Sequence, residues 1–373
     1  MAKPFPWRDQ QQARLWVDAT AYEPEMRQRI ERAEHYVLIE LYLMESGQVC
    51  NRVIPVLIAA AQRGVQVLLL LDSYGSAALN DADRRRLVEA GVDLGWFNPL
   101  RWHKLGRNLV RDHRKLIVVD GHTAFVGGFG WADEFETGEV PWHEVAMEIQ
   151  GDCVGDWQTL FWRSWRQARA PDVVLPDPRS CQGEMSEHRL KGRVVHAQGV
   201  YLQVVKHSLL YRLRHAQHRA WIATPYFVPT RPIRRALIAA AQRGVDVRLL
   251  LPGPHHDHPW IRLAGQQFYQ RLLANGVRIY EYQPRFIHAK VSRVDDWVSV
   301  GSCNFDHWGL RWNREANQEL EGADAAWPVT EWFQSGFDQG QAIDPQRWAQ
   351  RSRWQKIQQA FWGWVNGLMM KLH

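Results

Sequence analysis

The chain has 373 residues, of which 46% are hydrophobic, 12% aromatic and 23% charged. These fractions are typical of a globular protein and exclude a disordered or collagen-like chain. The length predicts two domains or two halves of one. The formal net charge of +6 and an isoelectric point near 9.2 favour an anionic partner, which nucleic acid, acidic lipid and phosphate esters all satisfy.

The four cysteines form no CxxC pair, which indicates a reducing compartment rather than a disulfide framework or a zinc site. They are Cys50, Cys153, Cys181 and Cys303. The N-terminal segment has charges and prolines where a signal peptide needs an apolar run, so none is expected. The apolar runs at 37–44 and 65–71 are shorter than the about 20 residues that span a bilayer. They are therefore predicted to be buried strands.

The octapeptide IAAAQRGV occurs at 58–65 and again at 238–245. Each copy ends an amphipathic helix at a glycine, and an apolar strand follows. A second helical stretch and a strand come next, at 91–97 in the first half and at 276–282 in the second. A His-x-Lys motif then follows in both halves, so we infer an internal duplication.

Strands that alternate with helices predict α/β units built on parallel sheets, one in each half. We place the N-terminal half at 1–170, a connector rich in proline, aspartate and serine at 171–187, and the C-terminal half at 188–340. A tail follows at 341–373. The two sheets are expected to face each other across a pseudo-twofold axis, so that equivalent strand ends meet in one shared active site.

Two copies of an HxKxxxxD motif stand at equivalent places in the halves. They are His113, Lys115 and Asp120 in the first half and His288, Lys290 and Asp295 in the second. Residues two apart on a strand share a face, so each histidine and lysine should project into one space. Ammonium groups donate to phosphate oxygens, and an imidazole can attack phosphorus or move a proton. The aspartates, five residues beyond the lysines, are expected to brace the local fold. One copy would read as a surface pair, but two equivalent copies predict a shared catalytic site.

With these motifs the chain resembles the phospholipase D superfamily and, within it, the bacterial cardiolipin synthases. The resemblance extends to GGFGWADEF after the first motif, to a GSxN signature at 301–304, and to LLLDSYGS at 69–76 and PYFVP at 225–229. It implies two duplicated α/β/α sandwich halves and a ping-pong transfer through a covalent phosphohistidine. His113 is assigned as the nucleophile and His288 as the acid and base, an assignment that the pseudo-symmetry leaves open to reversal.

The resemblance also implies an orienting carboxylate for each histidine, supplied by the opposite half. By position these are Glu315 for His113 and Glu144 for His288, and an ordinary surface carboxylate is the alternative for each. Glu144 stands where relatives often have aspartate.

Phosphate binding is expected to fall on Ser302 and Asn304 of the GSxN signature, together with the two lysines. The first half has Gly128 and Gly130 where the family pattern often has serine and asparagine, so it offers fewer donors.

No metal or other cofactor is expected. The run HHDH at 255–258 resembles a metal box, but adjacent residues rarely converge on one ion, and we interpret it as a loop over the cleft. Neither an HExxH motif nor a cluster of carboxylates occurs elsewhere in the chain.

The resemblance therefore implies a cardiolipin-synthase-like phosphatidyltransferase that acts on phosphatidylglycerol, peripheral on the cytoplasmic side of the cytoplasmic membrane. With water as the acceptor, the same residues would make a phospholipase D or another phosphodiesterase. A catalytically weak scaffold that binds acidic lipid is a third reading, which Gly130 keeps open. Nucleic acid is not expected as a partner, because a nuclease better suits a small homodimer with one motif per chain. The sequence leaves the acceptor and the oligomeric state open.

The tail begins with Asp344 as a helix N-cap and Pro345 at the first helical position. Apolar residues at helical spacing follow along one face: Trp354, Ile357, Phe361, Trp364, Leu368 and Leu372. Arginines and lysines accompany them, which is the composition of a helix in a bilayer interface. A helix packed on the protein's own core or on a dimer partner is the alternative.

Overall fold

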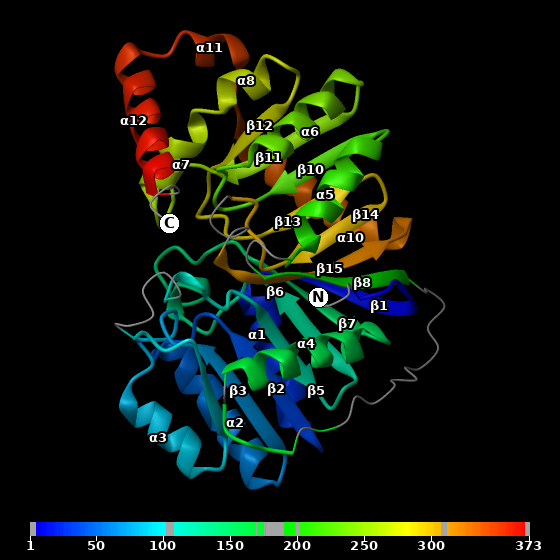
Figure 1. The fold of residues 1–373 in the computed structure, drawn as a ribbon, viewed down its shortest axis with the longest axis vertical. Coiled ribbons are helices and arrows are strands. Elements are labelled where there is room, and N and C mark those ends of the chain that lie inside the picture. Colours follow the sequence, from blue (N-terminus) through cyan, green and yellow to red (C-terminus); the bar gives the residue numbers. More distant parts are fainter. Residues whose placement is uncertain are drawn as a thin grey trace.

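A computed structural model describes residues 5–101, 108–168, 170–174, 176, 190–198, 202–306 and 312–369. The two halves lie one above the other in Figure 1, and each consists of a sheet covered by helices. The N-terminal half contains β1 (Arg8–Val17), α1 (Ala19–Glu31), β2 (Tyr36–Leu41), α2 (Gln48–Gln62), β3 (Gln66–Asp72), α3 (Asp81–Glu89), β4 (Asp93–Phe97), β5 (Lys115–Val119), β6 (Thr123–Gly127), the 3₁₀ turn η2 (Asp133–Phe135), β7 (Val145–Gln150) and α4 (Cys153–Ala168).

The C-terminal half repeats this order. It contains β8 (Leu190–Gln198), β9 (Leu202–Gln203), α5 (Val204–His215), β10 (Arg219–Ala223), α6 (Arg231–Gln242), β11 (Asp246–Pro252), α7 (Pro259–Gln266), α8 (Tyr269–Leu273), β12 (Arg278–Tyr282), β13 (Val291–Val294), β14 (Trp297–Gly301), β15 (Arg314–Glu321), α10 (Ala323–Asp338) and β16 (Gly340–Ala342). The tail forms α11 (Pro345–Ala349) and α12 (Arg353–Met369). Because β16 pairs with β12, it belongs with this half rather than with the tail.

The strand order shows the duplication directly. From the centre outward, the first half runs β1-β7-β6-β5-β2-β3-β4, and the second runs β8-β15-β14-β13-β10-β11-β12 with β16 added at the edge. The expectation of parallel sheets is correct only for the outer three strands of each repeat. The inner strands pair antiparallel, and β1 and β8 join the two halves into one continuous sheet.

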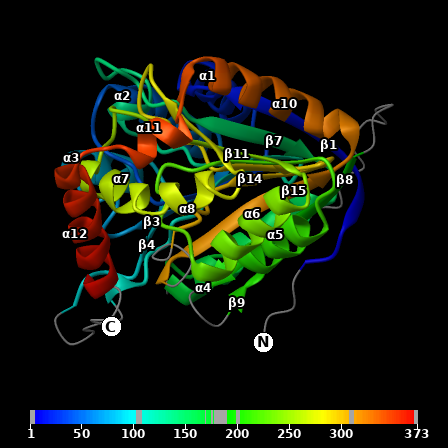
Figure 2. The same cartoon turned by 90° about the horizontal axis from the view of Figure 1, so that it is seen from above.

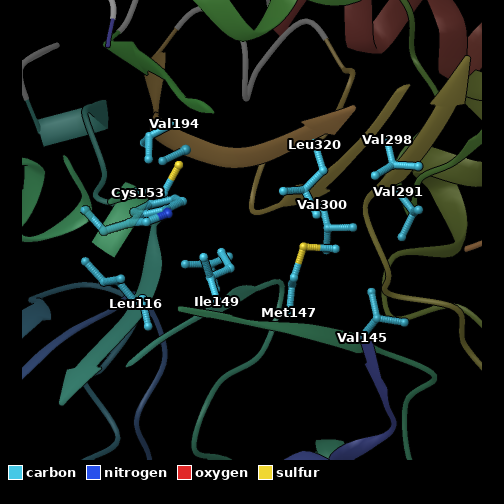
Figure 3. Close-up of a cluster of buried hydrophobic side chains, with 14 of the residues drawn as sticks. Leu116, Val145, Met147, Ile149, Cys153, Val194, Val291, Val298, Val300 and Leu320 are labelled. Carbon is cyan, nitrogen blue, oxygen red and sulfur yellow. The ribbon is translucent and has the colours of Figure 1, made fainter. Parts of the chain in front are cut away.

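Each sheet has helices on both faces, which confirms the predicted sandwich halves. Figure 2 shows the C-terminal sheet between α10 on one side and α5 and α6 on the other. The two halves of the continuous sheet also pack on each other through one buried cluster of side chains. In this cluster, Leu116 and Ile149 of the first half face Val300 and Leu320 of the second (Figure 3). This shared core holds the halves in a fixed relation.

The repeated octapeptide performs the same structural task in both halves. Gly64 and Gly244 have φ of +90° and +88°, so each ends its helix in the left-handed conformation that favours glycine. Arg63 donates to the carbonyl of Glu31 at the end of α1 at 2.8 Å, and Arg243 donates to a carbonyl of α5 at 2.9 Å. The repeat therefore ties each helix pair together.

The tail departs from the expected single helix. Asp344 does cap α11, since its carboxylate accepts from the backbone N–H of Arg347 at 2.7 Å. A second helix then begins after Ser352. The hydroxyl of Ser352 accepts a hydrogen bond from the N–H of Gln355, and the N–H of Ser352 donates to the Gln355 side chain. This reciprocal cap begins α12. No helix among the described residues is long and apolar enough to span a bilayer.

The connector proposed at 171–187 lies largely outside the described residues, between α4 and β8. Among the cysteines, Cys50, Cys153 and Cys303 are buried and unpaired, and Cys181 lies outside the described part of the chain.

Asp120 and Asp295, the last residues of the two motifs, brace the sheets in matching ways. The carboxylate of Asp120 accepts from the backbone N–H groups of residues 34, 35 and 36 at 2.8–2.9 Å. That of Asp295 accepts from residues 217, 218 and 219 at 2.9–3.0 Å. Both residues have positive φ, near +50°. Each therefore holds the start of a neighbouring strand, β2 or β10.

We expect Asp120→Ala and Asp295→Ala each to lower the free energy of unfolding by about 2–4 kcal/mol, because three backbone donors lose a charged acceptor and alanine disfavours this φ. Asparagine at either position should cost less, since it tolerates the left-handed conformation and keeps one acceptor oxygen. Urea unfolding measures the difference, with Asp296→Ala on the exposed neighbouring side chain as the control. A loss no larger than that of the control would contradict a bracing role.

Candidate active site

Two short backbone bridges join the halves at the site. The segment before β5 pairs with the start of β15: the N–H of His113 donates to the carbonyl of Arg314 at 3.0 Å, and the N–H of Arg314 to that of Arg111 at 2.9 Å. In the equivalent bridge, the N–H of His288 donates to the carbonyl of His143 at 2.8 Å. Each histidine thus lies beside the start of a strand of the opposite half, where a glutamate stands: Glu315 on β15 and Glu144 directly before β7.

The first histidine lies against Glu315. Its Nδ1 is 3.0 Å from the Glu315 carboxylate, and both side chains are buried. Lys115 donates to the carbonyl of His113 at 2.7 Å, which turns the ammonium back towards the histidine. The ring of Tyr42 covers this pair, with its centre 4.9 Å from the imidazole centre and 5.2 Å from the Lys115 ammonium.

The second histidine lies against Glu144. The Nδ1 of His288 is 2.6 Å from the Glu144 carboxylate, and the ammonium of Lys290 is 3.6 Å from the same carboxylate. Lys290 also donates to the carbonyl of His288, as Lys115 does to that of His113. Since Nδ1 faces a carboxylate in both pairs, Nε2 is the ring nitrogen on the side away from the carboxylate. The Nε2 of His288 lies 2.9 Å from the Lys290 ammonium.

The two motifs share one electrostatic environment. Burial and the charges of Lys115 and Lys290 hold the pKa of His113 well below its usual value, so a lysine of each half acts on this histidine. Burial and Lys290 lower the pKa of His288 to about 4, while Glu144 opposes the shift. The structure therefore brings the predicted histidines, lysines and glutamates of both halves together in one buried site.

The lysines and glutamates also have displaced pKa values. Burial lowers the pKa of Lys115 to about 7 and that of Lys290 to about 8. It raises the pKa of Glu315 to about 8, against the opposing effect of Lys115. For Glu144, burial acts upward, but Lys290 and His288 outweigh it, and the pKa lies below its usual value. Such displacement at a cluster of convergent groups is characteristic of functional sites.

Ser302 requires a revised role. Its hydroxyl donates to Glu315 at 2.6 Å and accepts from the backbone N–H of Ala316 at 3.0 Å, so it positions Glu315 rather than pointing a free hydroxyl at phosphate. Asn304 differs. Its side chain is buried, and its Oδ1 has no hydrogen-bond partner in the part of the chain that the structure describes. This oxygen can accept but not donate a hydrogen bond, so binding of a phosphate oxygen would fall to the amide nitrogen, and phosphate binding by Asn304 stays a prediction.

The glycines of the first half also have a structural reason. A Cβ added at Gly128 would lie 2.2 Å from the Glu144 carboxylate, so this carboxylate fills the space that a serine side chain would need. A Cβ at Gly130 would lie 3.0 Å from the carbonyl oxygen of Leu43 and 3.1 Å from the ring of Phe135. The first half therefore has no counterpart of the Ser302 and Asn304 side chains.

Aromatic side chains around His288 were missed from the sequence. Trp142, Phe135 and Phe286 have ring centres 4.9, 5.6 and 5.8 Å from that of the imidazole. Trp142 lies two residues before Glu144, and Phe286 two residues before His288. The two-residue period of an extended chain was therefore the signal that could have found these two.

The HHDH run does lie next to the site. The His256 ring is 5.0 Å from that of Phe286, and the Nδ1 of His256 is 3.0 Å from the Asp257 carboxylate. Tyr226 donates its hydroxyl to Asp257. Within the described residues, no group of three or more His, Cys, Asp or Glu side chains is placed to hold a metal ion.

Comparison with known proteins identifies the family. Residues 26–165 and 209–336 both match the family described as cardiolipin synthase, PLD-like domain. The chain belongs to the phospholipase D superfamily. It is 31% identical to cardiolipin synthase A of Pseudomonas putida (strain W619) over 93% of this chain and 72% of that protein. It is 32% identical to a cardiolipin synthase of Geobacillus sp. (strain WCH70) over 87% of this chain and 66% of that protein. The resemblance inferred from the motifs is thus confirmed.

Solved structures agree on the fold. The crystal structure of phosphatidylserine synthase from Haemophilus influenzae Rd KW20 superposes with a TM-score of 0.72 at 13% identity, covering 91% of this chain and 89% of that one. The match of one phospholipase-D-like domain to two ranges of this chain, together with this neighbour, confirms the duplicated architecture.

The lysine pKa values predict how a phospholipase-D-type site should bind anions. Both ammonium groups must be protonated to attract an anion, and their charge is lost as the pH rises through about 7 and 8. The affinity for sulfate, which stays a dianion over this range, should therefore fall at least about tenfold between pH 7 and pH 9. Isothermal titration calorimetry measures it. Lys115→Arg, which keeps its charge, should flatten the profile. An unchanged affinity from pH 7 to pH 9 in the parent protein would contradict these lysine assignments.

Proposed function

We propose that this protein is a cardiolipin-synthase-like phosphatidyltransferase that works through a covalent phosphohistidine. The observation that carries the proposal is the exchange of carboxylates between the halves: His113 pairs with Glu315 and His288 with Glu144. Two differently placed imidazoles then flank one anion site that contains two buried lysines. A double displacement at phosphorus needs these groups: a nucleophile, a proton donor and acceptor, and positive charge at the phosphate.

The proposed donor is phosphatidylglycerol. The Nε2 of His113 attacks its phosphorus, the bond from phosphorus to the glycerol headgroup oxygen breaks, and His288 gives that oxygen a proton. The terminal hydroxyl of a second phosphatidylglycerol then gives its proton to His288 and attacks the same phosphorus. The P–N bond breaks and His113 is restored. The balance is two phosphatidylglycerols in, one cardiolipin and one glycerol out.

The surroundings of the histidines support this division of roles. Glu144 and Asp257 both favour protonation of His288, although burial lowers its pKa to about 4. A bound anionic phosphate raises the pKa of a nearby imidazole, so in the complex His288 is the histidine better able to hold and return a proton. His113 lies beside Glu315, whose own pKa of about 8 makes it a weaker negative partner near neutral pH, and two lysines act against its protonation. A neutral imidazole is the form that attacks phosphorus.

A phospholipid substrate lies in a bilayer, so we propose that the protein acts peripherally at the cytoplasmic membrane, on its cytoplasmic side. Lys115, Lys290 and Asn304 hold the phosphate in this scheme, and the lysines supply the positive charge that many phosphoryl-transfer sites take from a divalent ion.

Incubation with phosphatidylglycerol vesicles in EDTA should yield cardiolipin, identified by mass spectrometry of the extracted lipids, and glycerol, measured in the aqueous phase. Cardiolipin with excess glycerol should return phosphatidylglycerol, because the two half-reactions are reversible. A His113→Ala/His288→Ala protein is the control. Phosphatidic acid as the sole product would identify a hydrolase, and the absence of any product would identify a binding scaffold. Loss of activity in EDTA that a divalent ion restores would contradict the proposed phosphate site.

The roles of the histidines can be separated with a phosphatidyl ester of p-nitrophenol, a leaving group that needs no proton. His288→Ala should still release nitrophenolate and accumulate the phosphatidyl adduct, since only its second step needs a base. His113→Ala should form no adduct. Peptide mass spectrometry locates the phosphorus, with His122→Ala on the exposed turn after β5 as the control. An adduct on His288 would reverse the assignment.

A further inference from the structure

The helix α12 packs on the protein through a mainly polar face. Gln359 is buried and donates to Gln266 at the end of α7 at 3.2 Å. Gly363 lies so close to Gln267 that an added Cβ would come within 2.3 Å of its side chain. Gln355, Gln358 and Gln359 also line a cavity of about 440 Å³ between α12 and α11. The face turned to the protein therefore carries glutamine and glycine, together with the half-buried Trp362, whose ring centre lies 6.3 Å from that of Trp260 on α7.

The face turned to solvent is apolar. Trp354, Ile357, Phe361 and Trp364 are 66%, 57%, 52% and 63% exposed. Their spacing of three and four residues places them on one stripe, roughly opposite Gln359 around the helix. An amphipathic helix on a globular protein ordinarily buries its apolar stripe against the core, so α12 is inverted. Four large exposed apolar side chains on one helix mark a surface that takes a partner.

The charges beside this stripe favour an anionic partner. Arg353 and Lys356 are exposed on α12, and Arg347 is exposed on α11. The chain has no aspartate or glutamate from Pro345 to His373. Tryptophan and phenylalanine flanked by cations, without carboxylates, are suited to the boundary between anionic headgroups and acyl chains.

The stripe is also connected to the active site. The helix α7, on which α12 packs, starts at Pro259, directly after the loop whose His256 contacts Phe286 beside His288. Figures 1 and 2 both place α12 on the same side of the molecule as α3 of the N-terminal half. The loops before α3 and after β4, which follow the strand ends on the active-site edge of that sheet, expose Tyr74 and Leu100.

We propose that Trp354, Ile357, Phe361 and Trp364 dock α12 into the interface of an anionic phospholipid bilayer and so hold the active site against lipid headgroups. This inference names the membrane-binding surface of the proposed phosphatidyltransferase, and its account of substrate access rests on that function. Docking should be reversible, because only four apolar side chains enter the bilayer interface. It should also be salt-sensitive, because salt screens the attraction between the cations of the protein and the anionic headgroups.

Vesicle flotation tests the docking surface. The variant Trp354→Ser/Ile357→Ser/Phe361→Ser/Trp364→Ser should bind vesicles of phosphatidylglycerol and phosphatidylcholine at least about tenfold more weakly than the parent. Phe361→Ser/Trp364→Ser should show a partial loss. The control is Tyr211→Ser/Trp327→Ser, which removes residues 57% and 64% exposed on α5 and α10 and should bind like the parent. The parent should bind pure phosphatidylcholine vesicles weakly.

A second measurement separates docking from catalysis. Turnover of a short-chain, monomeric phosphatidylglycerol should stay within about twofold in the fourfold variant, because its substitutions lie outside the active site, whereas turnover on vesicles should fall with binding. Parent-like vesicle binding by the fourfold variant would overturn the proposal, as would conversion of a parent dimer to a monomer in light scattering with binding unchanged. If the parent binds vesicles, the variant does not, and neither makes cardiolipin, the docking surface stands and the proposed transferase activity fails.

Discussion

The active site depends on one constraint: each histidine must meet a glutamate that the other half of the chain supplies. The backbone bridges at His113–Arg314 and His143–His288 enforce this, because they fix the register between the halves at the point where the side chains meet. A shift of one residue in either bridge would turn the glutamate to the opposite face. The shared core between the sheets keeps both bridges closed, so packing far from the site sets its geometry.

That geometry concentrates charge in a poorly solvated space. Two ammonium groups, two carboxylates and two imidazoles are buried together, and burial disfavours the charged form of each of them. The low pKa values of Lys115 and Lys290 and the high value for Glu315 express this cost. An entering phosphate supplies the negative charge that the lysines lack, and binding should then be coupled to proton uptake. The site is thus arranged for an anion rather than for its own stability.

Much of the fold followed from the repeat and from motif spacing, because both are local patterns. The repeated octapeptide predicted the equivalent helices of the two halves, and the HxK motifs predicted where the equivalent strands begin. The antiparallel pairing of β5, β6 and β7 did not follow, because strands covered on both faces show the same apolar pattern in parallel and antiparallel sheets. The role of Ser302 and the ring of Tyr42 over His113 depend on contacts between distant segments, which no local pattern contains.

A duplicated site faces a further problem, since the two sides of one phosphorus need different chemistry. The halves differ where this matters. Gly128 leaves room for the Glu144 carboxylate. This carboxylate accepts a hydrogen bond from the N–H of Val145 and lies beside Lys290, and both contacts lower the pKa of Glu144. In the other half, Ser302 is present and donates to Glu315, whose pKa is raised by burial. The two histidines are therefore inequivalent, with an anionic partner for one and a more nearly neutral partner for the other. Burial sets the raised pKa of Glu315 even though the Ser302 hydrogen bond acts to lower it, and Lys290 and His288 set the lowered pKa of Glu144.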